Sequence, residues 1–102
     1  MTSASDFKEH LAKDRRLCIL RVLTETGGTA NDSVLHTALE AFGFRRHPRS
    51  VVHEDIRFLK SVGLVIEEWV RSVQIVTITT RGVDVAEGRE IVEGVKKPSI
   101  GV

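Results

Sequence analysis

Several residue types and patterns are scarce in this 102-residue sequence, and each absence excludes a class of protein. A single cysteine, Cys18, has no partner for an internal disulfide, and its apolar surroundings indicate a small buried hydrophobe instead of a redox or catalytic thiol. No apolar run approaches the roughly 20 residues that span a bilayer, and residues 1–10 lack the basic and then apolar segments of a signal peptide. We therefore expect a cytoplasmic protein that does not enter a membrane.

The motifs of common enzyme chemistry are also missing. There is no glycine-rich phosphate loop, no Gly-x-Ser-x-Gly elbow and no His-Glu-x-x-His pattern. The four histidines show no close-packed ligand spacing, which argues against a metal site. Glu67, Glu68 and the acids after residue 84 could carry acid–base chemistry, but exposed carboxylates are usually solvated. We expect no enzyme, no cofactor and no metal, and no small-molecule substrate is evident.

The composition is that of one ordinary globular domain, with 41% hydrophobic and 28% charged residues. The formal net charge of +1 indicates little about partners, but the distribution of charge is uneven. Residues 45–60 hold five Lys/Arg against two acids, a local charge of +3, whereas residues 27–44 carry −2. The basic segment is therefore the first place to look for a binding surface.

Residues 5–26 are predicted to form a first helix, which ends at Gly27–Gly28 because glycine readily adopts the left-handed backbone of a helix C-terminus. The second half of this helix is apolar nearly all round, so it is either central to the core or shared with a second subunit. A short extended piece at Thr29–Ala30 can follow it. One stripe of the helix contains Phe7, Leu11, Cys18 and Val22.

A second amphipathic helix is capped by Asn31, Asp32 or Ser33 and stopped by Gly43. The link from Gly43 to Pro48 is so short that the second and third helices must meet at a sharp angle, as a helix-turn-helix requires. The apolar face of the second helix contains Leu35, Ala38, Leu39 and Phe42.

The third helix, predicted over residues 48–62, has one apolar face and one polar face. Pro48 suits its first turn, and Gly63 follows its end. Asp55 projects onto the apolar side, so we expect it to pair with Arg15 or Arg16. The apolar arc contains Val51, Val52, Ile56, Phe58, Leu59 and Val62, and the outward face presents Ser50, His53, Glu54, Arg57 and Lys60, an arrangement typical of a recognition helix.

After Gly63 the hydrophobic period changes to about two, which predicts strands over residues 64–70 and 73–79 with Arg71 and Ser72 between them. No Asn-Gly or Asp-Gly marks the turn, so the register stays open. Trp69 either packs on the neighbouring helix, stacks on a nucleobase or fills a dimer seam. A fourth helical piece follows, with Thr79 or Thr80 as its cap, Val83 and Ala86 facing inward and Gly88 at its end. Residues 89–102 have no sustained period and are predicted to be a mobile or partner-dependent tail.

This order of elements resembles the winged helix-turn-helix family of DNA-binding domains over residues 7–88. The segments DIRFLKSVGLV and VTITTRGVDVAEG are similar to the recognition helix entering a wing strand and to the strand and helix that follow the wing. More narrowly, DRRLCILRVL, SVLHTALEAFG and EGVKKPSIG resemble the small winged-helix proteins of Mu-like phages and prophages. The resemblance implies an α+β winged helix-turn-helix domain over residues 1–88, with a three-helix core, a two-stranded β-hairpin wing and a C-terminal helix, followed by the tail at 89–102.

The resemblance also implies a surface that binds double-stranded DNA. The third helix would enter the major groove, where an arginine fork can pair with guanine at about 1–3 kcal/mol of discrimination per contact. Glu54 departs from the typical pattern because phosphate repels it, although a carboxylate can accept from cytosine. The candidates are Arg49, Ser50, His53 and Arg57 for bases or nearby phosphates, Arg45, Arg46, His47 and Lys60 for docking and the backbone, and Arg71 for a wing contact.

We therefore expect a DNA-binding protein, a small phage or prophage transcriptional regulator or DNA-processing accessory. A homodimer is expected because two half-sites multiply a modest monomer affinity. The alternative is a winged-helix module that binds protein and not DNA, an interpretation favoured by Glu54, the near-neutral charge and the apolar half of the first helix. The sequence leaves open the operator, activation or repression, any effector, the dimer interface and the role of the tail.

Overall fold

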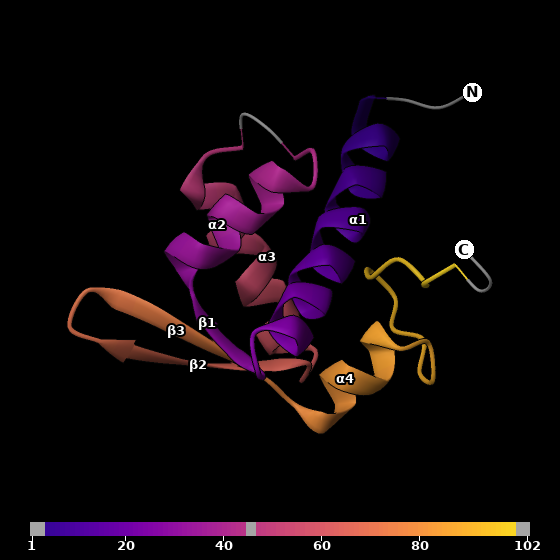
Figure 1. The fold of residues 1–102 in the computed structure, drawn as a ribbon. Helices are drawn as coiled ribbons and strands as arrows, with labels where there is room; N and C mark the ends of the chain where they lie inside the picture. The colour runs from indigo at the N-terminus through magenta and orange to yellow at the C-terminus, as the bar shows by residue number, and fades with distance from the viewer. Residues whose placement is uncertain (1–3, 45–46, 100–102) are drawn as a thin grey trace.

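The computed structural model describes residues 4–44 and 47–99, and within them four helices and one three-stranded antiparallel sheet (Figure 1). The α+β class expected from the sequence is confirmed. The elements are α1 (Ala4–Glu25), β1 (Thr29–Asn31), α2 (Asp32–Ala41), α3 (Arg49–Ser61), β2 (Val65–Val70), β3 (Val73–Ile78) and α4 (Thr80–Ala86).

Local side-chain and backbone chemistry sets where the shorter helices begin and end. The Asn31 side chain accepts a hydrogen bond from the backbone N–H of Val34, which caps α2, and the Thr79 hydroxyl accepts one from Gly82 and caps α4. Past the end of α3, Gly63 adopts φ +80°, a left-handed conformation that favours glycine. These positions match the caps and stops predicted from the sequence.

The sheet has the strand order β1-β3-β2, and β2 and β3 form a hairpin that projects away from α1 and α4 (Figure 1). Val70 pairs with Val73 across a two-residue turn, which fixes the register that the sequence left open. The extended piece at the end of α1 becomes a third strand, because Thr29 pairs with Thr77 of β3. The sheet therefore contains one strand more than the predicted hairpin.

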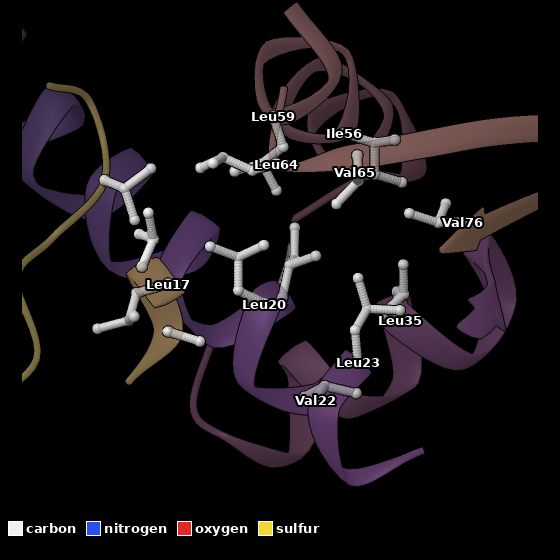
Figure 2. Close-up of a cluster of buried hydrophobic side chains, with 14 of the residues drawn as sticks. Leu17, Leu20, Val22, Leu23, Leu35, Ile56, Leu59, Leu64, Val65 and Val76 are labelled. Carbon is white, nitrogen blue, oxygen red and sulfur yellow. The ribbon is translucent and has the colours of Figure 1, made fainter. Parts of the chain in front are cut away.

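The second half of α1 is central to the core of this single chain, which was one of the two alternatives for its apolar surface. Leu20 and Leu23 are buried against Leu35 of α2, Ile56 of α3 and the base of the hairpin (Figure 2). The buried cluster comprises Leu17, Ile19, Leu20, Val22, Leu23, Leu35, Leu39, Val52, Ile56, Leu59, Leu64, Val65, Val76, Val85, Ala86, Val92 and Val95.

Two aromatic residues that follow the predicted apolar stripes lie largely outside this core. Phe42 is 62% exposed, because α2 ends at Ala41 and Phe42 is its C-cap residue, beyond the helical face that Leu35 and Leu39 bury. Phe7, near the start of α1, is 60% exposed. The prediction that Phe42 continues the buried face of α2 is therefore wrong.

A buried ion cluster joins α1 to α3, as expected for Asp55. The Asp55 carboxylate accepts hydrogen bonds from Nε of Arg15 at 2.5 Å and Nε of Arg16 at 3.2 Å, and its side chain is 1% exposed. The Arg16 guanidinium also lies 4.0 Å above the ring of Phe58 and donates to the carbonyl oxygen of Gly94 at 2.9 Å. The cluster therefore fixes both α3 and the C-terminal segment against α1.

The segment that follows α4 contains no helix or strand in residues 89–99, yet it packs on the core. Val92 and Val95 are buried in the main cluster, and the backbone N–H of Lys96 donates to the carbonyl of Lys13. The core thus extends beyond the predicted boundary at residue 88, while the mobility or partner dependence of 89–102 stays a prediction. In the described part of the chain, no helix has both the length and the apolar character needed to cross a membrane.

Candidate nucleic-acid interface

The outward face of α3 is built by the same periodicity that buries its inner face. Val52, Ile56 and Leu59 are at most 1% exposed, and this places Ser50 and Arg57 in solvent on the other side. The described residues therefore show the amphipathic third helix that the sequence predicted. A polar side chain on this face can bind a partner only if other residues of the chain do not already engage it.

The start of α3 is tied to α2. Nη2 of Arg49 lies 3.3 Å from the hydroxyl of Ser33, at the beginning of α2, although Arg49 is exposed. The backbone carbonyl of His47 is 2.8 Å from Nε2 of His36. These contacts tie the residues at the start of α3 to α2. Arg45 and Arg46, two of the predicted phosphate contacts, lie outside the described residues.

His47 lies on a different side of α3 from the other candidates. It lines a groove of about 450 Å³ between the first turns of α1 and the start of α3, together with Val51 and Glu54. Its ring lies 6.3 Å from that of Phe44. His47 therefore contributes to the α1 side of α3, whereas His53 and Arg57 line a cavity on the hairpin side.

His53 connects α3 to two other elements. Its Nε2 lies 3.0 Å from Oδ2 of Asp32, in the first turn of α2. Its ring also meets the ring of Trp69 edge-on, at 6.4 Å between centroids. Trp69 thus contacts the neighbouring helix, as one interpretation of the sequence held, but half of it remains exposed. Both contacts restrict the orientation of the His53 ring.

A network of hydrogen bonds links the end of α3 to the hairpin. Glu67 accepts from Nζ of Lys60 at 2.7 Å and from Nε2 of Gln74 at 2.6 Å. These two hydrogen bonds lower the pKa of Glu67 below its usual value of 4.5, with a smaller contribution from the charge of Arg57. Lys60 is therefore partly neutralised within the chain. Gln74 is buried, and its Oε1 has no hydrogen-bond partner in the described structure.

Arg57 and this network border one small cavity of about 250 Å³ between α3 and the hairpin, lined by His53, Arg57, Glu67, Trp69 and Gln74. The sequence did not single out Gln74. Its only signal is a polar residue among the apolar residues of the second predicted strand, opposite Trp69 in the observed register. Within the described residues, Arg57 makes no hydrogen bond or close ion pair, and its guanidinium is exposed to solvent.

Arg71 occupies the tip of the hairpin in a conformation that favours glycine. Its φ is +58°, and it is the one non-glycine residue with positive φ in the described chain. It is exposed and makes no hydrogen bond or ion pair among the described residues. Glycine would adopt this backbone without steric cost, so the arginine at this position carries local strain.

The exposed polar groups of this surface are mainly hydrogen-bond donors with positive charge. Guanidinium and ammonium groups from α3 and the hairpin can donate to phosphate or base oxygens. The described residues contain no group of three His, Cys, Asp or Glu side chains that could hold a metal ion. Burial raises the pKa of Cys18 to about 11, which leaves its thiol protonated near neutral pH. A helix face joined to a projecting hairpin therefore defines the candidate site of a small α+β protein.

Comparison with known proteins places this chain in a family. It is 47% identical over 88 residues to the uncharacterized protein gp26 of Escherichia phage Mu, a match that covers 86% of this chain and 91% of that protein. It is 36% identical over 76 residues to an uncharacterized protein of Haemophilus influenzae, covering 74% of each. No model of a known protein family matches the chain. The chain belongs to the family of the phage Mu gp26 protein.

Proposed function

We propose that this chain is a winged helix-turn-helix protein that binds double-stranded DNA as a homodimer, with α3 in the major groove and the β2–β3 hairpin as the wing. A phage or prophage transcriptional regulator or DNA-processing accessory fits this activity. The phage origin of the gp26 relative supports the setting. The order of three helices, hairpin and fourth helix supports the fold.

The observation that carries the proposal is the pair of unengaged guanidiniums on α3 and the hairpin. Arg57 and Arg71 are both exposed, and neither makes a hydrogen bond or close ion pair within the described chain. Lys60 and His53, by contrast, are held by Glu67 and Asp32. A cation kept in a strained turn has no visible structural purpose, whereas a phosphate or minor-groove contact would give it one.

The binding mode follows from groove dimensions. A major groove about 12 Å wide admits one helix, and Ser50 and Arg57 lie on the α3 face that would meet base edges. Arg49, beside the N-terminus of α2, would contact the phosphate backbone. Glu54 opposes phosphate, so sequence preference at its position would come from a base that donates a hydrogen bond, such as cytosine.

Fluorescence-anisotropy titration of the protein into duplex DNA from a random library selection tests this proposal. Affinity should fall steeply with salt, and the double variant Arg57→Ala/Arg71→Ala should reduce both the affinity and the salt slope. Lys97→Ala, which removes an exposed cation from the C-terminal segment, is the matched control and should bind as wild type. A salt-independent affinity, or equal binding by the double variant, would contradict the proposal.

A second candidate function, protein binding by a winged-helix module without DNA binding, is favoured by the outer face of the sheet. Ile66, Val70 and Val73 are exposed on the hairpin, and each is an apolar side chain of a size usually buried. Retention of one defined protein on immobilised wild type but not on Ile66→Ser/Val70→Ser, with no DNA binding at low salt, would establish this alternative. DNA retention that the two serine substitutions leave unchanged would exclude it.

A further inference from the structure

One face of α1 is incompletely covered along most of the length of the helix, with only Cys18 at its centre packed partly against the core. Its residues recur at alternating spacings of four and three, the repeat of a coiled-coil seam. Every one of them is exposed or only half-buried, although the adjacent faces of α1 are covered by α2, α3 and the C-terminal segment. We call this face the α1 seam; it consists of Phe7, Leu11, Asp14, Cys18, Arg21 and Glu25.

Apolar surface continues beside the second half of the α1 seam. A groove of about 570 Å³ lies there, in which Phe42 and Phe44 flank Cys18 and Val22. Phe42, which lines this groove, is 62% exposed in the single chain. Burying exposed apolar area stabilises an association by about 25 cal/mol per Å² before entropic costs, so this face gains from being covered.

The charges of the α1 seam are complementary to those of a second copy of the same helix. Asp14 and Arg21 lie two turns apart. The Arg21 side chain makes no hydrogen bond or ion pair among the described residues, although its backbone carbonyl accepts from the Thr24 hydroxyl. The Asp14 side chain forms an exposed ion pair with Lys96 at 3.2 Å. At about 1.5 Å of rise per residue, Asp14 lies roughly 6 Å to one side of Cys18 and Arg21 roughly 4.5 Å to the other. An identical antiparallel helix centred at Cys18 therefore brings Asp14 opposite the partner's Arg21, twice by symmetry.

The same charges oppose the other orientation. In a parallel pair each residue faces its own copy, so Asp14 would face Asp14 and Arg21 would face Arg21, both repulsive. In the antiparallel pair Glu25 comes opposite Leu11 of the second chain, near the end of the contact, where its carboxylate can reach water. The surface is thus self-complementary about a two-fold axis, as an interface between identical chains must be.

We propose that a second copy of this chain docks on the α1 seam, antiparallel, with the two-fold axis at Cys18 and ion pairs between Asp14 and the partner's Arg21. This inference rests on the homodimer of the proposed function and names its contact surface. It is tested without DNA, so its failure and the failure of DNA binding are separate results.

Sedimentation equilibrium of the full chain, from micromolar to millimolar concentration, measures the association. Arg21→Asp should raise the dimer dissociation constant by about tenfold or more, because two like-charged contacts replace two ion pairs. The exchange Asp14→Arg/Arg21→Asp restores the pairs in the opposite sense and should return the constant toward wild type. Lys97→Asp, a similar charge change on the C-terminal segment, is the control and should dimerise as wild type.

Cross-linking of the single cysteine tests the position of the axis independently of any substitution. Helices pack with axes about 8–10 Å apart, a distance that a short bismaleimide spans. Cys18 should therefore give a covalent dimer at alkaline pH, slowly because burial keeps most of its thiol protonated. A wild-type chain that stays monomeric overturns the inference. A dimer that Arg21→Asp leaves unchanged, or that the charge exchange fails to restore, equally overturns it. So does a dimer whose Cys18 reacts with a monofunctional maleimide but gives no cross-link.

Discussion

The hairpin tip permits a substitution that should move stability and DNA binding in opposite directions. Arg71 has φ +58°, and a side chain in this region costs about 1–2 kcal/mol relative to the right-handed conformation. Arg71→Gly removes that strain, but glycine loses about 0.5–1 kcal/mol more in conformational entropy on folding. The difference predicts a net gain of about 0–1.5 kcal/mol in the free energy of unfolding, or a rise of up to roughly 12 °C in Tm.

The same substitution removes a cation from the proposed DNA surface. One phosphate contact contributes about 0.9 to the slope of log affinity against log salt, so the slope should become shallower by about that amount. Arg71→Ala is the matched variant, because it removes the cation and keeps the Cβ that strains the turn. It should lose the same salt slope with no gain in stability.

Differential scanning calorimetry and anisotropy titrations on the three proteins give both quantities. A lower Tm for Arg71→Gly would refute the assignment of strain to this turn. DNA affinity that stays at the wild-type value in both variants would refute the contribution of the hairpin tip, even if the stability result held. The paired measurement therefore separates the structural statement about the turn from the functional one.

Three further predictions concern packing and charge. Asp55→Ala leaves Arg15 charged and without its buried partner, which should cost about 3–5 kcal/mol in urea unfolding, whereas retention of wild-type stability would show that the pair is not buried in solution. Gly94→Ala would place a Cβ against the ring of Phe58 at a φ of +97°, so the free energy of unfolding should fall by about 1–3 kcal/mol. An unchanged midpoint would show that this segment does not pack on α3. Because the folded pKa of Glu67 is lowered, its contribution is present above pH 4.5 and lost as pH falls through the folded value. Glu67→Gln should therefore lose stability relative to wild type at neutral pH and match it in acid, and a constant difference across that range would contradict the assignment.

Local patterns predicted most of the secondary structure because each pattern acts over a few residues. The 3.6-residue period placed α2 and α3, and glycines after each marked their ends. The pairing of Thr29 with Thr77 was beyond such reasoning, since strand pairing joins segments 48 residues apart and three residues carry no period. The prediction that Phe42 is buried was wrong for a related reason. Helical periodicity predicts which side of a helix is buried only as far as the helix continues, and α2 ends at Ala41.

The C-terminal segment shows the limit of composition as a guide. Its glycines and Pro98 indicate irregular backbone, and the described residues 89–99 contain no helix or strand. Irregular backbone can still pack: Val92 and Val95 fill the core, and Gly94 comes so close to Phe58 that no side chain fits between them. The contacts that hold this segment come from α1 and α3, which no local pattern in residues 89–102 reveals.

The sequence predicted which basic side chains lie on the candidate site, but not which of them are already paired with acids of the same chain. Helical periodicity placed His53, Arg57 and Lys60 on one face of α3. The acids that engage two of them, Asp32 and Glu67, lie on α2 and β2 and reach α3 only through the tertiary fold. A charge count over residues 45–60 therefore overstates the positive surface that a phosphate would meet.

Because some of these cations are already paired within the chain, one chain can neutralise only a few phosphates. If Arg49 and Arg71 were the only cations of the described surface to reach phosphates, with Arg57 on a base edge, one chain would neutralise about two phosphates. The salt slope would then be roughly −1.8, which is small for a DNA-binding protein. Two chains related by the axis at Cys18 would double the slope to roughly −3.6, provided that both α3 helices reach the duplex. Arg21→Asp, which lies outside the DNA surface, should then reduce the slope toward the single-chain value at protein concentrations where wild type is dimeric. If the variant kept the full wild-type slope, DNA binding and the α1 seam would be independent properties of the chain.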